Sequence, residues 1–95
     1  MAFRTTPRAD QDLAELYRHG TLTYGLEAAT NYAEGFRDVF AFLSQFPRAT
    51  RERDEVSPSV RIHPYRSHLV AYRIEDEDVV VVRILHQRSA WTEEL

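Results

Sequence analysis

The sequence contains no cysteine, no lysine and no long apolar segment. Without cysteine the chain cannot form a disulfide framework or a thiolate site for metal or redox chemistry, which suits a reducing cytosol. No stretch approaches the roughly 20 apolar residues that a membrane-spanning helix needs. The N-terminal residues also lack the apolar core of a signal peptide. We therefore expect a cytoplasmic protein that does not enter a membrane.

Glycine and histidine are too sparse or too scattered for two common kinds of site. The three glycines are far apart and cannot form a phosphate-binding loop. The four histidines include no pair at the spacing of metal ligands on one helix. No serine lies in a nucleophile elbow. The sequence thus predicts no metal, no cofactor and no serine-dependent hydrolysis.

The size of the chain limits it to one small domain, which we expect to span residues 1–95. Hydrophobic residues make up 43% and charged residues 28%, which is ordinary globular usage and argues against disorder. A domain this small buries a modest share of its surface, so a bound partner can add to its stability. The net charge of −3 argues against a surface that binds polyanions throughout.

Positive charge is nevertheless concentrated in the C-terminal half. All 12 basic residues are arginine, which reflects either genomic composition or a preference for planar, bidentate contacts. Residues 57–74 and 79–92 contain no acid, and together they carry five arginines: Arg61, Arg66, Arg73, Arg83 and Arg88. This half is therefore the first place to look for contacts with an acidic partner.

The N-terminal half predicts a short strand and two helices. Residues 2–6 form a weak strand candidate that Pro7 ends. Helical spacing of apolar residues follows over 8–19, where Gly20 interrupts it and leaves the continuation open. A longer stripe covers 26–46 and ends at Pro47, with Gly35 suggesting close packing on the first helix. The glycine-bounded turn makes an antiparallel helical hairpin the natural arrangement.

The C-terminal half predicts a sheet. A polar loop over 48–59 precedes strands at 60–63, ending at Pro64, at 68–75 and at 79–86. The acidic residues 75–78 indicate a hairpin turn, and the β-branched run over 79–84 indicates a central strand buried on both faces. The expected fold is α+β: an N-terminal strand and an antiparallel helical hairpin packed on a mainly antiparallel sheet, in the order β-α-α-β-β-β.

Two motifs within this order resemble a known family. Ser67-His68 followed by Tyr72-Arg73, and Arg83-Ile84-Leu85-His86 after the acidic turn, are similar to the signature of ParE toxins in the RelE/ParE superfamily. The resemblance extends upstream through the Tyr17 helix, the Gly25 break and Phe46-Pro47. It covers nearly the whole chain and implies the fold expected above.

The resemblance implies a toxin that a cognate antitoxin holds inactive within a hetero-oligomer. Such antitoxins are similar to ParD, whose ribbon-helix-helix part binds DNA, so this chain would reach DNA only through its partner. ParE-like toxins poison DNA gyrase without catalysis. RelE-like members of the superfamily instead cut messenger RNA in the ribosome, and fold alone does not choose between these activities. A third possibility is a chain that has lost toxicity and only forms the complex.

Candidate residues follow from these alternatives. A nuclease would use Arg61 and Arg83 on the scissile phosphate and His86 for proton transfer. The chain lacks the lysines and the C-terminal tyrosine of RelE-like sites, so the nuclease is the minority interpretation. The candidates for partner binding, which have structural alternatives such as an ion pair for Arg83 and a core position for Tyr72, are Arg61, Arg66, His68, Tyr72, Arg83, Arg88 and Trp91.

Overall fold

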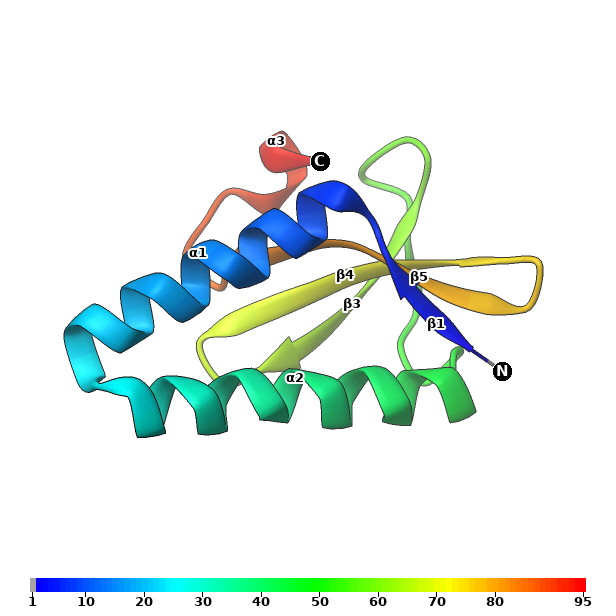
Figure 1. Cartoon of the computed structure of the whole chain (residues 1–95). Helices are drawn as coiled ribbons and strands as arrows, with labels where there is room; N and C mark the ends of the chain where they lie inside the picture. The colour runs from blue at the N-terminus through cyan, green and yellow to red at the C-terminus, as the bar shows by residue number, and fades with distance from the viewer. Residues whose placement is uncertain (1) are drawn as a thin grey trace.

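Two long helices cover one face of a five-stranded sheet in the computed structural model, which describes residues 2–95 (Figure 1). The elements are β1 (Phe3–Thr5), α1 (Pro7–Tyr24), α2 (Leu26–Gln45), β2 (Glu52–Arg53), β3 (Val60–Tyr65), β4 (His68–Glu75), β5 (Asp78–His86) and α3 (Trp91–Glu94). The strand order is β1-β5-β4-β3-β2, with β1 parallel to β5 and the other pairs antiparallel. The predicted α+β arrangement is confirmed, while β2 and α3 were not predicted. No helix within residues 2–95 is long and apolar enough to cross a membrane.

Thr6 and Pro7 turn the chain from the sheet into α1. The Thr6 hydroxyl accepts a hydrogen bond from the Ala9 amide at 3.1 Å, and Pro7 occupies the first helical position, where its missing N–H costs nothing. The Thr6 amide also donates to the Val81 carbonyl at 3.0 Å. The start of α1 is therefore fixed directly to β5.

Helix α1 continues through Gly20 to Tyr24, beyond the interruption that the apolar pattern suggested. A Cβ on Gly20 would lie 3.4 Å from that of Ala29, so α1 and α2 pack closely at Gly20. Gly25 alone joins the two helices, and its φ of +95° suits glycine.

Gly35 packs against the sheet and not against α1, which corrects the expectation from sequence. A Cβ at this position would overlap the Tyr65 hydroxyl on β3. That hydroxyl donates to the Tyr32 carbonyl at 3.2 Å, one turn earlier in α2. The absence of a side chain at Gly35 therefore brings α2 close to β3.

The sheet is buried on both faces at its centre. The main core lies between the sheet and the two helices, and its largest fully buried side chains are Tyr72, Phe36, Leu43, Val70, Val79 and Val81. On the opposite face Val80 and Val82 pack with Ala71 beneath Trp91 and Leu95. The prediction that the valine-rich strand is central and buried on both sides is confirmed, because the C-terminal segment covers the second face.

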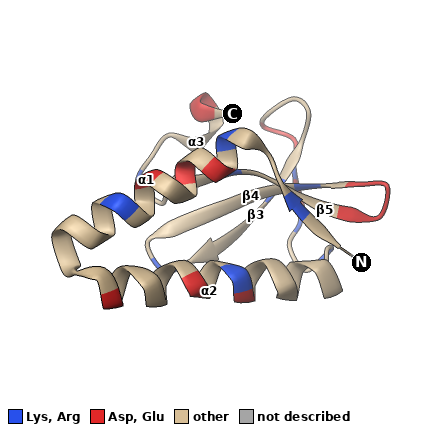
Figure 2. Ribbon diagram, in the orientation of Figure 1, with Lys and Arg blue, Asp and Glu red and all other residues tan. Residues whose placement is uncertain are grey.

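The strand boundaries follow the sequence closely, with one exception. The acidic turn between β4 and β5 places Asp76 and Glu77 at φ +51° and +69°, the arrangement of a two-residue hairpin, and it lies at one end of the molecule (Figure 2). Strand β3 runs through Pro64, where the sequence predicted its end. Because β2 pairs only with Val60 and Arg61, β3 is an edge strand from Ile62 onward, and edge strands tolerate proline.

A β-bulge in β5 decides where its polar side chains lie. Ala71 pairs with Arg83 and Tyr72 with Val81, which leaves Val82 as an extra residue. Strict alternation after Val81 would direct Arg83 toward the helices. The bulge instead places Ile84 in the helix-facing core and leaves Arg83 at the rim.

Substituting Gly35 tests the close approach of α2 to β3. Gly35→Ala should lower the free energy of unfolding by about 1 to 3 kcal/mol, because the added methyl group overpacks the contact with Tyr65. Urea unfolding followed by circular dichroism would measure the change. Glu34→Ala, an exposed change on the same helix, should have little effect. A Gly35→Ala protein as stable as the parent would contradict the packing described.

Candidate functional site

Arg83 forms a buried ion pair with Asp12 of α1. Its Nε donates to one Asp12 oxygen at 2.8 Å and its Nη2 to the other at 3.3 Å. The side chains are only 13% and 7% exposed. The hydrogen bond with Asp12 is the main cause that raises the pKa of Arg83. An ion pair with a carboxylate is one of the roles predicted for Arg83 from the sequence, and this prediction is confirmed.

Asp12 also completes the hydrogen bonding of the sheet edge. Strand β1 ends opposite Val81, so beyond that point β5 has no neighbouring strand on this side. The Ile84 amide there donates to the Asp12 carboxylate at 2.9 Å. Arg83 also donates to the Glu94 carbonyl at 3.1 Å. One carboxylate and one guanidinium thus connect α1, β5 and α3.

Arg61 and Tyr72 hold the segment after α2 against the sheet. The Arg61 guanidinium donates to the Thr50 carbonyl. The Tyr72 hydroxyl donates to the Pro47 carbonyl at 2.8 Å and lies 3.0 Å from the Thr50 hydroxyl. Tyr72 is fully buried, so its side chain is not at the surface where a partner could contact it.

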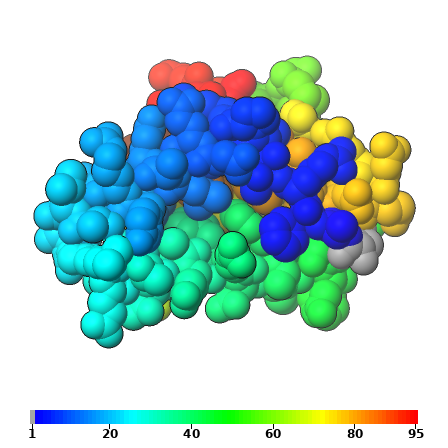
Figure 3. Space-filling view, viewed as in Figure 1, coloured from blue at the N-terminus to red at the C-terminus, as the bar shows by residue number. Residues whose placement is uncertain are grey.

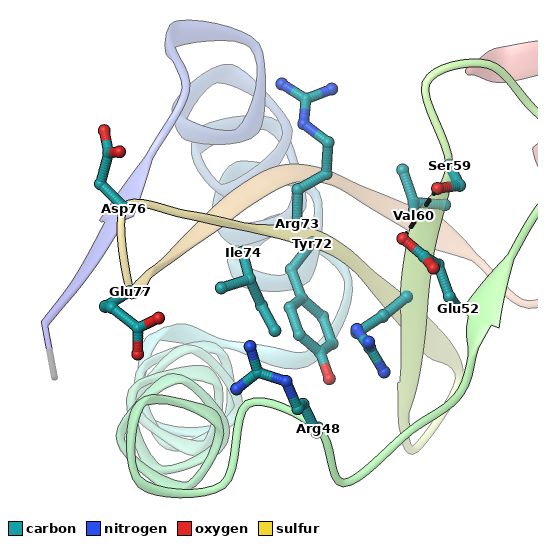
Figure 4. A pocket seen from close by; sticks show the side chains of 10 residues that line it. Arg48, Glu52, Ser59, Val60, Tyr72, Arg73, Ile74, Asp76 and Glu77 are labelled. Atoms are coloured by element: carbon teal, nitrogen blue, oxygen red, sulfur yellow. Dashed lines mark hydrogen bonds between the residues drawn. The ribbon is translucent and has the colours of Figure 1, made fainter.

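A cavity of about 450 Å³ lies beside these two residues. Arg48 extends beside the Tyr72 ring, whereas Arg73 points to the other side of the strand (Figure 4). Three carboxylates also line the cavity, from Glu52, Asp76 and Glu77. Because arginines and acids alternate around it, the cavity lacks the uniformly positive surface that a phosphate chain requires.

His68 and His86 face each other across β4 and β5, with ring centroids 5.3 Å apart. The Tyr32 hydroxyl of α2 lies 2.8 Å from Nδ1 of His68, and the Arg88 amide donates to Nδ1 of His86 at 3.1 Å. A cleft of about 400 Å³ opens at this end of the sheet, beneath the closed end of the helical hairpin. We call it the histidine cleft.

Burial determines the protonation of the aromatic groups in this cleft. It lowers the pKa of His68, and the nearby His86 lowers it further. Burial also raises the pKa of Tyr32, which therefore stays protonated. At neutral pH the cleft thus contains a neutral His68 that accepts from, or donates to, a phenol.

Arg66 and Arg88 are exposed and lie close in sequence to residues of the histidine cleft: Arg66 precedes Ser67, and Arg88 lies two residues after His86. Arg66 occupies the turn between β3 and β4 with φ +52°, and its guanidinium lies 5.8 Å from the Tyr65 ring centroid. Arg88 follows the end of β5. Neither forms an ion pair with any residue that the structure describes. Both remain candidates for binding an acidic partner.

Trp91 covers the second face of the sheet. Its ring packs against the Val60, Ala71, Val80 and Val82 cluster, and the Arg53 guanidinium lies 5.1 Å from its centroid. Trp91 is half-buried. It therefore has a packing role, and only part of its ring is available to a partner.

The three residues of the nuclease hypothesis are not gathered into one site. Arg61 lies on β3 and bonds to the loop after α2, whereas Arg83 lies two strands away and pairs with Asp12. His86 faces His68 and the histidine cleft. In this arrangement the three side chains are not directed at one common position where a phosphate could bind.

An apolar groove between α1, α2 and β1 was not predicted from the sequence. It has a volume of about 580 Å³ and is lined by Phe3, Leu13, Ala33, Phe36, Arg37 and Phe40. Phe3 is 42% exposed and packs on Phe40 at a ring centroid distance of 5.4 Å. We call this the interhelical groove; it lies where the atoms of α1 and β1 meet those of α2 (Figure 3). Apolar residues were predicted on both helices, but only their divergence in space creates the groove.

Exposed apolar side chains also gather at both ends of α2. Leu22, Tyr24 and Leu26 are between 62% and 79% exposed around the turn between the helices. Phe42 and Phe46 stack at the other end, with centroids 5.4 Å apart. Exposed apolar side chains that cluster in this way are candidates for contact with another macromolecule.

Comparison with known proteins agrees with this architecture. The family model described as "ParE toxin of type II toxin-antitoxin system, parDE" matches residues 3–91. Two curated relatives from Caulobacter vibrioides are similar: Toxin ParE3, at 35% identity over 90% of this chain and 84% of the relative, and Toxin ParE1, at 26% identity over 90% and 88%. A solved chain described as "Chromosomal ParDE TA system from P. aeruginosa" shares the fold with a TM-score of 0.78, at 22% identity over 90% of this chain and 95% of that chain.

Removing the Asp12 carboxylate tests the central ion pair. Asp12→Ala leaves the mostly buried Arg83 guanidinium with only its contacts to Glu94 and the Ile84 amide without its acceptor. The expected loss in the free energy of unfolding is about 3 to 5 kcal/mol. Chemical denaturation would measure it against Glu15→Ala, which removes an exposed carboxylate from the same helix. Equal stability of the two variants would show that the pair is dispensable.

Proposed function

This chain belongs to the family of ParE toxins of type II toxin–antitoxin systems, and from that membership we propose that a ParD-like antitoxin neutralises it by binding the interhelical groove. The observation that carries the proposal is the groove itself. It is apolar, it lies on the outer surface of the molecule, and Phe3 within it is 42% exposed. A polypeptide that filled this groove would remove apolar surface from water, which is the main source of affinity in such contacts.

The shape of the groove favours an amphipathic helix as its occupant. Two helices and the first strand form its walls, and recognition of a helix in such a groove depends on apolar anchors at helical spacing. Arg37 is the one charged residue among those that line it. An acidic residue on the antitoxin helix would meet Arg37 at the rim and fix the orientation of the helix.

The target that we propose is DNA gyrase, inhibited without catalysis. Family membership supports this choice, and so does the dispersal of the residues that RNA cleavage would need. Arg83, one of the two arginines in the nuclease hypothesis, is paired with Asp12 and Glu94. A toxin that acts by occupying its target needs exposed contact surface, which the ends of α2 supply.

Phe3 provides a test of antitoxin binding. Phe3→Ser should weaken binding of the antitoxin encoded beside the toxin by at least about tenfold, equivalent to about 1.4 kcal/mol, because it removes an apolar wall of the groove. Isothermal titration calorimetry would measure the affinity. Phe46→Ser removes a more exposed apolar side chain that lines neither the interhelical groove nor the histidine cleft, and it should leave affinity unchanged. Equal losses in both variants would argue against the groove.

The gyrase assignment has a direct biochemical test. Purified toxin should inhibit supercoiling by gyrase, or trap cleaved DNA, and stoichiometric antitoxin should reverse the effect. Primer extension on translated messages should reveal no new 5′ ends. Active gyrase at saturating toxin would remove gyrase as the target, and toxin-dependent messenger cleavage would replace it with RNA.

A further inference from the structure

We propose that the histidine cleft receives a carboxylate side chain of the antitoxin, with Nε2–H of His68 and Nε2–H of His86 as its donors. The site lies outside the interhelical groove, at the end of the sheet beneath the closed end of the hairpin. The inference rests on the proposed function, since it takes the antitoxin as the polypeptide that supplies the carboxylate.

Hydrogen bonds on the far side of each imidazole determine which nitrogen carries the proton. The Tyr32 hydroxyl lies 2.8 Å from Nδ1 of His68, and in the proposed arrangement the phenol is the donor of this hydrogen bond. The Arg88 amide donates to Nδ1 of His86. A neutral imidazole that accepts at Nδ1 carries its hydrogen on Nε2. Neither Nε2–H has an acceptor among residues 2–95.

The surroundings of the two donors favour a carboxylate. None of the described residues that line the cleft is acidic, whereas Arg66 directly precedes Ser67 and Arg88 lies two residues after His86. No permanent cation lines it either, which favours a singly charged carboxylate over a phosphate dianion. Leu16 and Ala29 offer an apolar wall for the methylene groups of an aspartate or glutamate. A volume of about 400 Å³ admits such a side chain.

The rim of the cleft is suited to exclude water from that contact. Tyr24 lines the cleft and is 75% exposed, and Leu22 and Leu26 adjoin it on the same turn. Apolar residues that surround a buried polar contact strengthen it by keeping solvent out. An acidic residue flanked by apolar residues on the antitoxin would match both parts of the surface.

A carboxylate in this position makes binding proton-linked. In the free toxin His68 contacts Tyr32 of α2 and His86 of β5, and His19 of α1 lines the same cleft. Burial, and then the nearby His86, keep the pKa of His68 low. A bound carboxylate favours the imidazolium and raises that pKa. The complex therefore takes up a proton, and affinity should increase as pH falls through the raised pKa of the bound form.

The experiment measures antitoxin affinity for the full chain between pH 6 and 8.5. The parent toxin should bind at least about fivefold more tightly at pH 6 than at pH 8, and His68→Gln/His86→Gln should lose this dependence. His63→Gln, a change on β3 outside the cleft, should retain it. In NMR titrations of the parent toxin, the pKa of His68 should rise when the antitoxin binds, a readout that needs no variant.

Tight binding with no pH dependence and an unchanged His68 titration would overturn the cleft proposal while leaving the antitoxin assignment intact. Failure of the parent toxin to bind at any pH would overturn the antitoxin assignment itself. A short RNA that shifts the histidine signals when the antitoxin does not would reassign the cleft to nucleic acid.

Discussion

The rest of this structure depends on the Asp12 carboxylate, which lies where β1 ends and β5 has no neighbouring strand on that side. Strand β1 pairs with only three residues of β5, and the chain then leaves the sheet to begin α1. Asp12 returns from that helix to accept the Ile84 amide and the Arg83 guanidinium. A buried charge is costly unless it is paired and hydrogen-bonded. Here the Asp12 carboxylate neutralises the Arg83 guanidinium and accepts hydrogen bonds from both donors. The position of α1, and with it the hairpin that α1 forms with α2, is fixed by this requirement.

The same region explains why the arginines of the C-terminal half do not form one positive site. The bulge at Val82 shifts the alternation of β5, so that Ile84 faces the core and Arg83 reaches the rim. Arg61 is directed to the carbonyl of a loop on the other side of β4. Arg66 and Arg88 remain exposed at the end of the sheet. Arginines that are close together in the sequence therefore have different roles in the fold: Arg61 and Arg83 hold elements together, whereas Arg66 and Arg88 lie on the surface.

Much of the fold could be predicted from sequence because its signals are local. Apolar spacing, Pro7, Pro47 and the acidic turn each act within a few neighbouring residues. The errors concern contacts between distant segments. Gly20 lies within a continuous helix that packs against Ala29, and Gly35 makes room for the side chain of Tyr65, thirty residues away. The candidate site was less predictable for the same reason. Arg83 could be assigned an ion pair but Asp12 could not be identified, and the interhelical groove arises only from the divergence of two helices.

The pairing of β1 with β5 has a consequence for synthesis of the protein. Residues 3–5 hydrogen-bond to residues 79–81, so β1 has no strand partner until β5 has been synthesised. The valine-rich centre of the sheet is also made late, after both helices that pack on it. Contacts of such long sequence separation form slowly. The sheet therefore assembles only after β5 has been synthesised, later than both helices that cover it.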